Sequence, residues 1–202
     1  MKDSFDVKII GKQLISPKIT ISHIPDYIAN EDNVRSTILK SNQWLKFLVE
    51  EGEEFEYLFS YKPKDLISAV FRISPKIRQH IVEAGMKIKV GYRLCPAQDR
   101  FHVKQCGKCL KFGHNSRDCE ANMSLCAYCA SHHPSHTCQY KEREQRLHHR
   151  CANCLTHAEK KWNSEDNIFP HDAFNPYCLL KRMQKIRLIQ STNWGEAPPP
   201  AL

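Results

Sequence analysis

Four candidate metal ligands stand close together in the segment CGKCLKFGHNSRDC, residues 106–119. They are Cys106, Cys109, His114 and Cys119, at the spacing C-x2-C-x4-H-x4-C. Three thiolates and one imidazole suit zinc in a closed tetrahedral site, which leaves no coordination position for a substrate. Gly113 precedes the histidine and can adopt a positive φ at little cost, as so tight a turn requires. Because so short a segment cannot bury a core, we expect the metal to hold it folded.

A second segment repeats this pattern with one residue fewer before the histidine. Its ligands have the spacing C-x2-C-x3-H-x4-C and are Cys126, Cys129, His133 and Cys138. His132 and His136 lie close enough in the sequence to compete with His133. The spacing therefore predicts a second zinc site and leaves its histidine open.

A third set of ligands is more widely spaced and consists of Cys151, Cys154, His171 and Cys178. Sixteen residues separate Cys154 from His171, and His157 is the nearer alternative. Loop closure becomes more costly only slowly with length, so the long loop does not exclude His171, which we favour. We expect three zinc ions in all.

A different pairing of the cysteines is also conceivable. Sixteen residues separate Cys109 from Cys126, a spacing that matches a four-cysteine zinc ribbon. That pairing would leave His114 and Cys119 without a role, although their spacing already completes a site. The sequential arrangement is therefore favoured over the ribbon.

Composition and charge indicate the kind of partner. The chain has 202 residues, ten cysteines and a net charge of +8. Residues 1–99 carry 15 basic and 13 acidic side chains, whereas residues 100–188 carry 15 and 8. The cysteine-rich half is thus the basic half, which favours a polyanion such as nucleic acid. No apolar run of 18 residues is present, so we expect no membrane span.

The N-terminus is too polar for a secretory signal, so we expect an intracellular protein, cytoplasmic or nuclear, that is not secreted. Reduced cysteines in pairs then favour metal over disulfides. No catalytic constellation or phosphate-binding loop is evident, so we expect neither an enzyme nor a small-molecule substrate.

The elements that precede the metal ligands read as one mixed domain over residues 17–97. Strands are predicted at 18–25, 55–62, 66–73 and 86–94, from apolar alternation. Helices are predicted at 30–48 and from Pro75 to Gly85, the latter with Ser74 as its N-cap. The order β-α-β-β-α-β predicts an α+β, ferredoxin-like domain of the kind found in RNA-recognition motifs.

The outer face of this predicted sheet carries basic rather than aromatic residues. If Phe71 faces the core, Arg72 faces outwards, where Lys89 and Arg93 would join it. Such a face could follow phosphates but would stack bases poorly. We therefore expect a scaffold that makes some basic contacts.

The chain is accordingly divided into six segments. They are an N-terminal extension (1–16), the RRM-like domain (17–97), two tandem CCHC zinc knuckles (105–140), a charged linker (141–150), a third zinc-binding module with a basic exit helix (151–188) and a flexible tail (189–202).

The three cysteine motifs together resemble those of gag-like nucleic-acid-binding proteins of non-LTR retrotransposons. The matching runs are Cys106 to Cys119 with Phe112-Gly113-His114, Cys126 to Cys138, and Cys151-Ala152-Asn153-Cys154 with His171 and Cys178. The loop from Cys154 to His171 is longer than in that family. The resemblance implies binding of single-stranded RNA or DNA, a chaperone and packaging role, and self-association in a ribonucleoprotein. The source would be an element or a domesticated descendant of one.

Residues around the zinc sites are the candidate contacts with nucleic acid. We expect Leu110, Phe112 and Tyr128 to offer apolar platforms for bases, and each stacked base is worth about 1–3 kcal/mol. The candidate phosphate contacts are Lys108, Lys111, Arg117, Lys181, Arg182 and Lys185. The alternative is a cellular adaptor whose zinc knuckles bind another protein.

Overall fold

The computed structural model describes residues 14–28, 31–62, 66–161 and 170–196. The chain forms two compact units. The first unit comprises residues 1–100 together with 191–202, and the second unit comprises residues 101–190. Within the described ranges, no helix is both long and apolar enough to cross a bilayer.

The first unit is an α+β domain with a five-stranded antiparallel sheet. Its strands are β1 (Lys18–Ile24), β2 (Phe55–Tyr61), β3 (Ile67–Ile73), β4 (Lys87–Val90) and β5 (Arg93–Asp99). The spatial order is β2-β3-β1-β5-β4, and every neighbouring pair is antiparallel. The two central strands, β1 and β3, carry the most buried residues, as expected of strands flanked on both sides.

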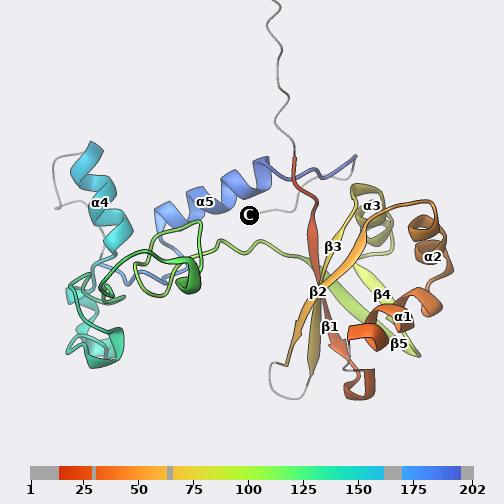
Figure 1. The fold of residues 1–202 in the computed structure, drawn as a ribbon, viewed down its shortest axis with the longest axis horizontal. Helices are drawn as coiled ribbons and strands as arrows, with labels where there is room; N and C mark the ends of the chain where they lie inside the picture. Colours follow the sequence, from red (N-terminus) through yellow and green to blue (C-terminus); the bar gives the residue numbers. More distant parts are fainter. Residues whose placement is uncertain (1–13, 29–30, 63–65, 162–169, 197–202) are drawn as a thin grey trace, which may run out of the picture. The chain divides into compact units, whose positions relative to one another are not determined.

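Three helices cover one face of this sheet (Figure 1). They are α1 (Glu31–Ser41), α2 (Gln43–Glu50) and α3 (Pro75–Glu83). Their buried side chains join those of the strands in one core, which includes Val34, Ile38, Leu45, Ile77, Ile81, Ile19, Ile21, Phe71 and Ile88. The start of α3 is as predicted, because the Ser74 side chain accepts a hydrogen bond from the Ile77 amide.

The prediction of one helix over residues 30–48 was wrong. Asn42 adopts an extended backbone conformation (φ −134°, ψ 92°) and separates α1 from α2. Its side-chain amide donates to the carbonyls of Ile38 and Lys89, both at 2.7 Å. These bonds join the end of α1 to β4 and outweigh continuation of the helix. Residues 29–30, where the helix was expected to begin, lie outside the described residues.

The predicted strand 86–94 is also corrected, since it forms parts of two strands. Gly91, at φ +61°, and Tyr92 make a turn between β4 and β5, and Val90 pairs with Arg93 across it. The turn reverses the chain and leaves the Tyr92 side chain fully exposed. The predicted turn at 62–65 falls largely on residues 63–65, which are not described.

The end of the chain differs from the expected flexible tail at 189–202. Helix α5 (Leu179–Gln190) includes the first two of those residues. Residues 191–196 then belong to the first unit, where Ile15 donates to Ser191 at 2.9 Å and Asn193 donates to Ile15 at 2.9 Å. Residues 1–13 and 197–202 lie outside the described residues.

The Trp194 side chain fixes this returning segment to the first unit. The Arg78 guanidinium lies 4.7 Å from the centre of the Trp194 ring. Arg78 also forms two hydrogen bonds, of 2.9 and 3.0 Å, with the buried Asp99 carboxylate. A paired and satisfied buried cation is thus capped by an aromatic ring, an arrangement that orders both groups.

Candidate metal centres and basic surface

Three clusters of cysteine and histidine side chains form in the second unit. Each contains three cysteines and one histidine whose ligand atoms lie within 4.8 Å of one another. The members are Cys106, Cys109, His114 and Cys119; Cys126, Cys129, His133 and Cys138; and Cys151, Cys154, His171 and Cys178. All ten cysteines are free thiols. The predicted sequential sets are therefore brought together, each with a donor set that fits one soft metal ion, and the ribbon pairing is not formed.

The first two clusters are built by the same local backbone. In the first, the Cys106 amide donates to Lys111 O at 2.9 Å and the Leu110 amide donates to Cys106 O at 3.0 Å. In the second, the Cys126 amide donates to Ser131 O at 2.8 Å and the Ala130 amide donates to Cys126 O at 3.0 Å. The repeated turn explains why the two motifs share C-x2-C spacing.

Two serines tighten these turns from a distance in sequence. Ser116 Oγ accepts from the Gly107 amide at 2.9 Å, and Ser135 Oγ accepts from the Ala127 amide at 2.9 Å. Each serine begins the short 3-10 helix that leads to the last cysteine of its cluster. The serine therefore fastens the start of the motif to its end.

Positive φ angles occur at more positions than predicted. Gly113 has φ +104°, as its place before His114 suggested. Leu110 and Ala130, at φ +63° each, occupy the same left-handed position after the cysteine pair of their clusters. Sequence reasoning missed these two because left-handed backbone is unusual for residues with a Cβ.

The histidine of the second cluster is His133. Its Nε2 lies 3.2 Å from Cys129 Sγ, while Nδ1 donates to the Pro134 carbonyl at 2.9 Å. This outer hydrogen bond, together with the Cys129 sulfur, raises the pKa of His133 and orients the ring. His132 and His136, the alternatives in the sequence, are not members of the cluster.

The third cluster is built from the starts of two helices. Cys151 immediately precedes α4 (Ala152–Lys161), Cys154 lies in its first turn, and Cys178 immediately precedes α5. Sulfur–sulfur distances to Cys178 are 4.0 Å from Cys151 and 3.5 Å from Cys154. His171 completes the cluster, with Nε2 at 3.5 Å from Cys154 Sγ.

The competing His157 lies elsewhere on α4 and takes no part in the third cluster. It follows Cys154 by three residues, so both lie on one strip of the helix, but the cluster closes at the N-terminal end of α4. The long loop is therefore compatible with a four-ligand site. Most of that loop, residues 162–169, is not described.

The thiols of the clusters do not ionise equally. Burial opposes ionisation of Cys106, but the amides of Cys109 and Lys108 donate to its sulfur and lower its pKa to about 6. Burial likewise opposes ionisation of Cys129. Hydrogen bonds from Ser131 outweigh it and lower the pKa of Cys129 to about 6. Burial and the neighbouring Cys126 and Cys129 thiols raise the pKa of Cys138 to about 11. Closely packed thiols resist ionising together because their negative charges would repel one another. A bound divalent cation offsets this repulsion and stabilises the thiolate forms.

The three clusters share one small core instead of forming independent modules. Leu110, Ala127, Cys151, Ala173 and Cys178 are buried together. Backbone bonds join the clusters: Leu125 donates to Lys108 at 2.8 Å and Ala173 donates to Ala127 at 2.8 Å.

This shared core corrects the expectation for Leu110, which is fully buried and has no surface for a base. Its carbonyl accepts from Asn153 Nδ2 at 2.8 Å and from Gln105 Nε2 at 3.1 Å. Leu110 is therefore a core residue of the second unit and not a platform for a base.

The other two expected platforms are half-buried. Phe112 lines a pocket together with residues of α4 and α5. The Tyr128 ring lies 5.3 Å from the His149 ring, and His149 itself is held by a 2.8 Å hydrogen bond to Tyr140 O. These contacts belong to the segment 141–150, of which residues 143–148 form a 3-10 helix.

The six predicted phosphate contacts all remain available as cations. Lys111, Arg117, Arg182 are exposed and Lys108, Lys181, Lys185 are half-buried. Lys181 Nζ donates to the Phe174 carbonyl at 3.1 Å, and Lys185 Nζ lies 5.5 Å from the Phe101 ring centre. Within the described part of the second unit, none of the six forms an ion pair with a carboxylate.

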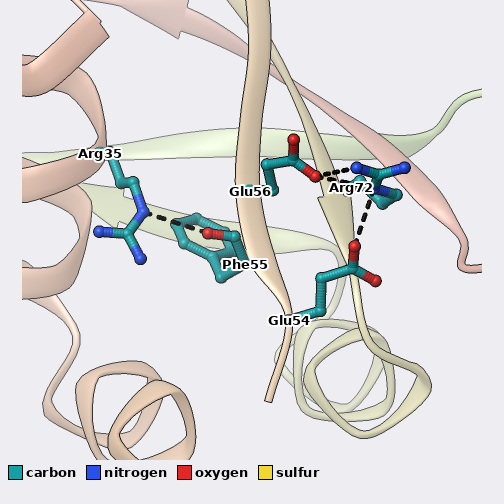
Figure 2. A network of polar contacts seen from close by, with 5 residues as sticks. All are labelled: Arg35, Glu54, Phe55, Glu56 and Arg72. Carbon is teal, nitrogen blue, oxygen red and sulfur yellow. Dashed lines mark hydrogen bonds and ion pairs between the residues drawn. The ribbon is translucent and has the colours of Figure 1, made fainter. Parts of the chain in front are cut away.

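The sheet of the first unit is different, because its Arg72 is already paired. Figure 2 shows the Arg72 guanidinium between two carboxylates, with Nε at 2.8 Å from both Glu54 Oε1 and Glu56 Oε2. Both carboxylates raise the pKa of Arg72, and Glu56 has the larger effect. On the other side of β2, Arg35 Nε donates to the Phe55 carbonyl at 3.1 Å. Arg72, which was expected to face phosphates, is thus engaged by two carboxylates of its own unit.

Two aromatic residues on the outer face of the sheet were missed. A bulge between Tyr57 and Phe59 places Phe59 opposite Val70 and Tyr61 opposite Ser68. Both aromatic side chains are consequently about two-fifths exposed, with the Arg100 guanidinium 5.3 and 5.6 Å from their rings. Strict alternation along β2 would put them in the core, so no signal in the strand pattern reveals the change of face.

Comparisons of the chain with protein-family models, with curated proteins and with solved structures found no match.

Proposed function

We propose that the second unit is a zinc-dependent module that binds single-stranded nucleic acid, with RNA as the preferred target. The observation that carries this proposal is the presence of six cations that form no ion pair with a carboxylate in the described part of a unit built around three Cys3His clusters. Residues 101–190 contain 14 basic and 8 acidic side chains, so the unit is an overall cation. A surface of this kind attracts a polyanion and holds it by displacing counterions.

The proposed metal is zinc, because three thiolates and an imidazole are its preferred closed donor set. Such ions would supply no reaction chemistry. They would hold the turns that present Lys108, Lys111 and Phe112 on one loop of the first cluster. The chain's own residues perform the recognition, cations on phosphates and Phe112 on a base.

We further propose a ferredoxin-like identity for the first unit. The order β2-β3-β1-β5 is the one such a domain requires, with β4 added as an edge hairpin. Because Arg72 is paired with two carboxylates, we expect this domain to act chiefly as a scaffold, with Phe59, Tyr61 and Arg100 as the remaining candidate contacts on its outer face. The resemblance to gag-like proteins, with packaging and self-association, remains a prediction of the three cysteine motifs.

The test is the binding of a labelled single-stranded RNA to the full chain over a range of salt concentrations. If about five phosphates are neutralised, log K falls with log salt at a slope of about −3.5. A double-stranded RNA of the same sequence is the control for strandedness. A response that does not depend on salt, or capture of a protein partner that RNA fails to displace, would favour the adaptor function instead.

A further inference from the structure

A pocket of about 280 Å³ lies between the first cluster and the two helices of the third. It is lined by Lys111, Phe112, Asn153, Thr156, His157, Leu180, Met183, Gln184 and Arg187. All of these residues belong to the second unit. The three contributing elements are the Lys111–Phe112 turn, α4 and α5.

The helical residues follow the spacing of a single helix face. On α4 they stand at i, i+3 and i+4, and on α5 at i, i+3, i+4 and i+7. The pocket is thus formed by one face of each helix, and the Lys111–Phe112 turn of the first cluster supplies its third wall. A hydrogen bond of 2.8 Å from Asn153 to the Leu110 carbonyl fixes α4 against that cluster.

The lining separates into three chemical kinds. Phe112, Leu180 and Met183 supply an apolar surface on which a flat ring can lie. Asn153, Thr156, His157 and Gln184 add hydrogen-bonding groups. Lys111 and Arg187 are exposed cations that pair with no described carboxylate. Among the described residues, none that lines the pocket is acidic. An apolar site with a few polar groups and an anion-attracting rim fits a nucleotide.

We propose that this pocket receives one unstacked base of a single-stranded nucleic acid, with its phosphate against Lys111 and Arg187. The base stacks on Phe112, and the side-chain amide of Gln184 reads its edge, as amides do with bases elsewhere. The proposal deepens the function proposed above and rests on it for the polynucleotide. It also makes this pocket the source of base preference, whereas the remaining cations give affinity without preference.

Formation of the pocket depends on two of the metal clusters at once. The first cluster positions Phe112, and the third holds the starts of α4 and α5 together through Cys151, Cys154 and Cys178. The protein used in any test must therefore carry its full complement of metal.

The first test compares pairs of variants that differ only with respect to the pocket. Thr156→Trp fills the pocket from an exposed helical position, and Thr156→Ala is its control. Arg187→Gln removes a rim cation, and Arg182→Gln removes an exposed cation from the same helix away from the pocket. Binding of single-stranded oligonucleotides of each of the four bases is measured by fluorescence anisotropy.

Loss of one stacked base corresponds to about tenfold in affinity or more. We expect Thr156→Trp to weaken binding of the preferred oligonucleotide by about tenfold and to reduce the differences in affinity among the four oligonucleotides. Thr156→Ala should change neither quantity. Arg187→Gln should weaken binding several-fold more than Arg182→Gln. Metal content and circular dichroism verify that each variant is folded; if Thr156→Trp is not, the arginine pair decides alone.

The second test separates the pocket from the proposed function. Nucleoside 5′-monophosphates are titrated into the metal-loaded chain and followed by NMR at Phe112 and Gln184, with inorganic phosphate as the control. If the two variants of each pair have equal effects while polynucleotide binding is intact, the proposed base-binding role of the pocket is wrong. The proposed nucleic-acid-binding function is then unaffected. Mononucleotide shifts without polynucleotide binding would uphold the pocket and overturn the function. Absence of both would overturn both.

Discussion

At the scale of single residues, Leu110 explains why the first cluster is more than a loop around an ion. Its left-handed backbone costs about 1–2 kcal/mol relative to the ordinary helical region. In return its side chain is fully buried, and its carbonyl accepts hydrogen bonds from Gln105 and Asn153. The equivalent Ala130 makes the same turn in the second cluster. Leu110 thus links the turn of one metal site to the core shared by all three.

Truncation of Leu110 tests this role. Leu110→Ala removes a fully buried side chain, so we expect the second unit to lose about 2–5 kcal/mol of stability. The measurement is unfolding of the metal-loaded protein by denaturant, with release of the metal ions as the signal. Leu147→Ala, which truncates a leucine that is 77% exposed in the same unit, is the matched control. Equal losses in the two variants would contradict the central place of Leu110.

The uneven thiol pKa values predict how metal retention depends on pH. Metal binds the thiolate form, so protons compete with it and affinity rises with pH. Because the pKa values of Cys106 and Cys129 are lowered to about 6, each of the first two clusters keeps one thiolate at neutral pH. We expect release to steepen as the pH falls through about 6.

A chromophoric chelator that reports freed metal measures this release between pH 8 and pH 4. Return to neutral pH with added zinc should restore the bound ions, which distinguishes protonation from irreversible oxidation. Release whose dependence on pH does not steepen near pH 6 would refute the assignment of these two thiols.

At the scale of elements, Asn42 shows how tertiary contacts override a helical pattern. Its side chain occupies a buried position at the junction of α1 and α2, where it bonds to the end of α1 and to both backbone groups of Lys89. The edge strand β4 is thereby joined to the helical layer. The apolar pattern of residues 30–48 gives no sign of this break, because the partner that stabilises the extended Asn42 is Lys89, which is distant in sequence.

Replacement of Asn42 tests the value of this junction. Asn42→Ala leaves the Lys89 carbonyl and amide without their partner, and an unsatisfied buried group costs about 1–3 kcal/mol. We expect a corresponding loss of stability in the first unit, measured by thermal unfolding monitored by far-UV circular dichroism. Asn33→Ala, on the exposed side of α1, should have little effect.

The elements also show what sequence can predict. Capping by Ser74 and the alternation in β1 and β3 are local signals, and they gave the correct elements. The turn at Gly91–Tyr92 and the bulge at Phe59 depend on strand pairing, so local alternation misassigned both. Likewise the C-x2-C spacing located the metal clusters because those ligands are local. The choice between His171 and His157 required the geometry of α4.

At the scale of the whole molecule, the two units have separate sources of stability. The first unit has an extensive apolar core, whereas the core of the second consists of a few residues, two of them cysteines of the third cluster. We therefore expect a chelator to unfold the second unit and leave the first folded.

Amide hydrogen exchange before and after chelation resolves the two units. Protection in β1 and β3 should persist while protection in α5 is lost, and added zinc should restore it. Loss of protection in β1 and β3 along with α5 would show that the two units unfold as one.

The return of residues 191–196 to the first unit has a topological consequence for the second. The chain leaves the first unit at Arg100, which donates to Lys18 at 2.8 Å, and re-enters at Ser191, which accepts from Ile15 at 2.9 Å. Both anchors thus lie beside the start of β1. When metal is lost, residues 101–190 become a closed loop and not a free tail. Like a disulfide, this closure limits the entropy of the unfolded segment and so favours its refolding around the ions.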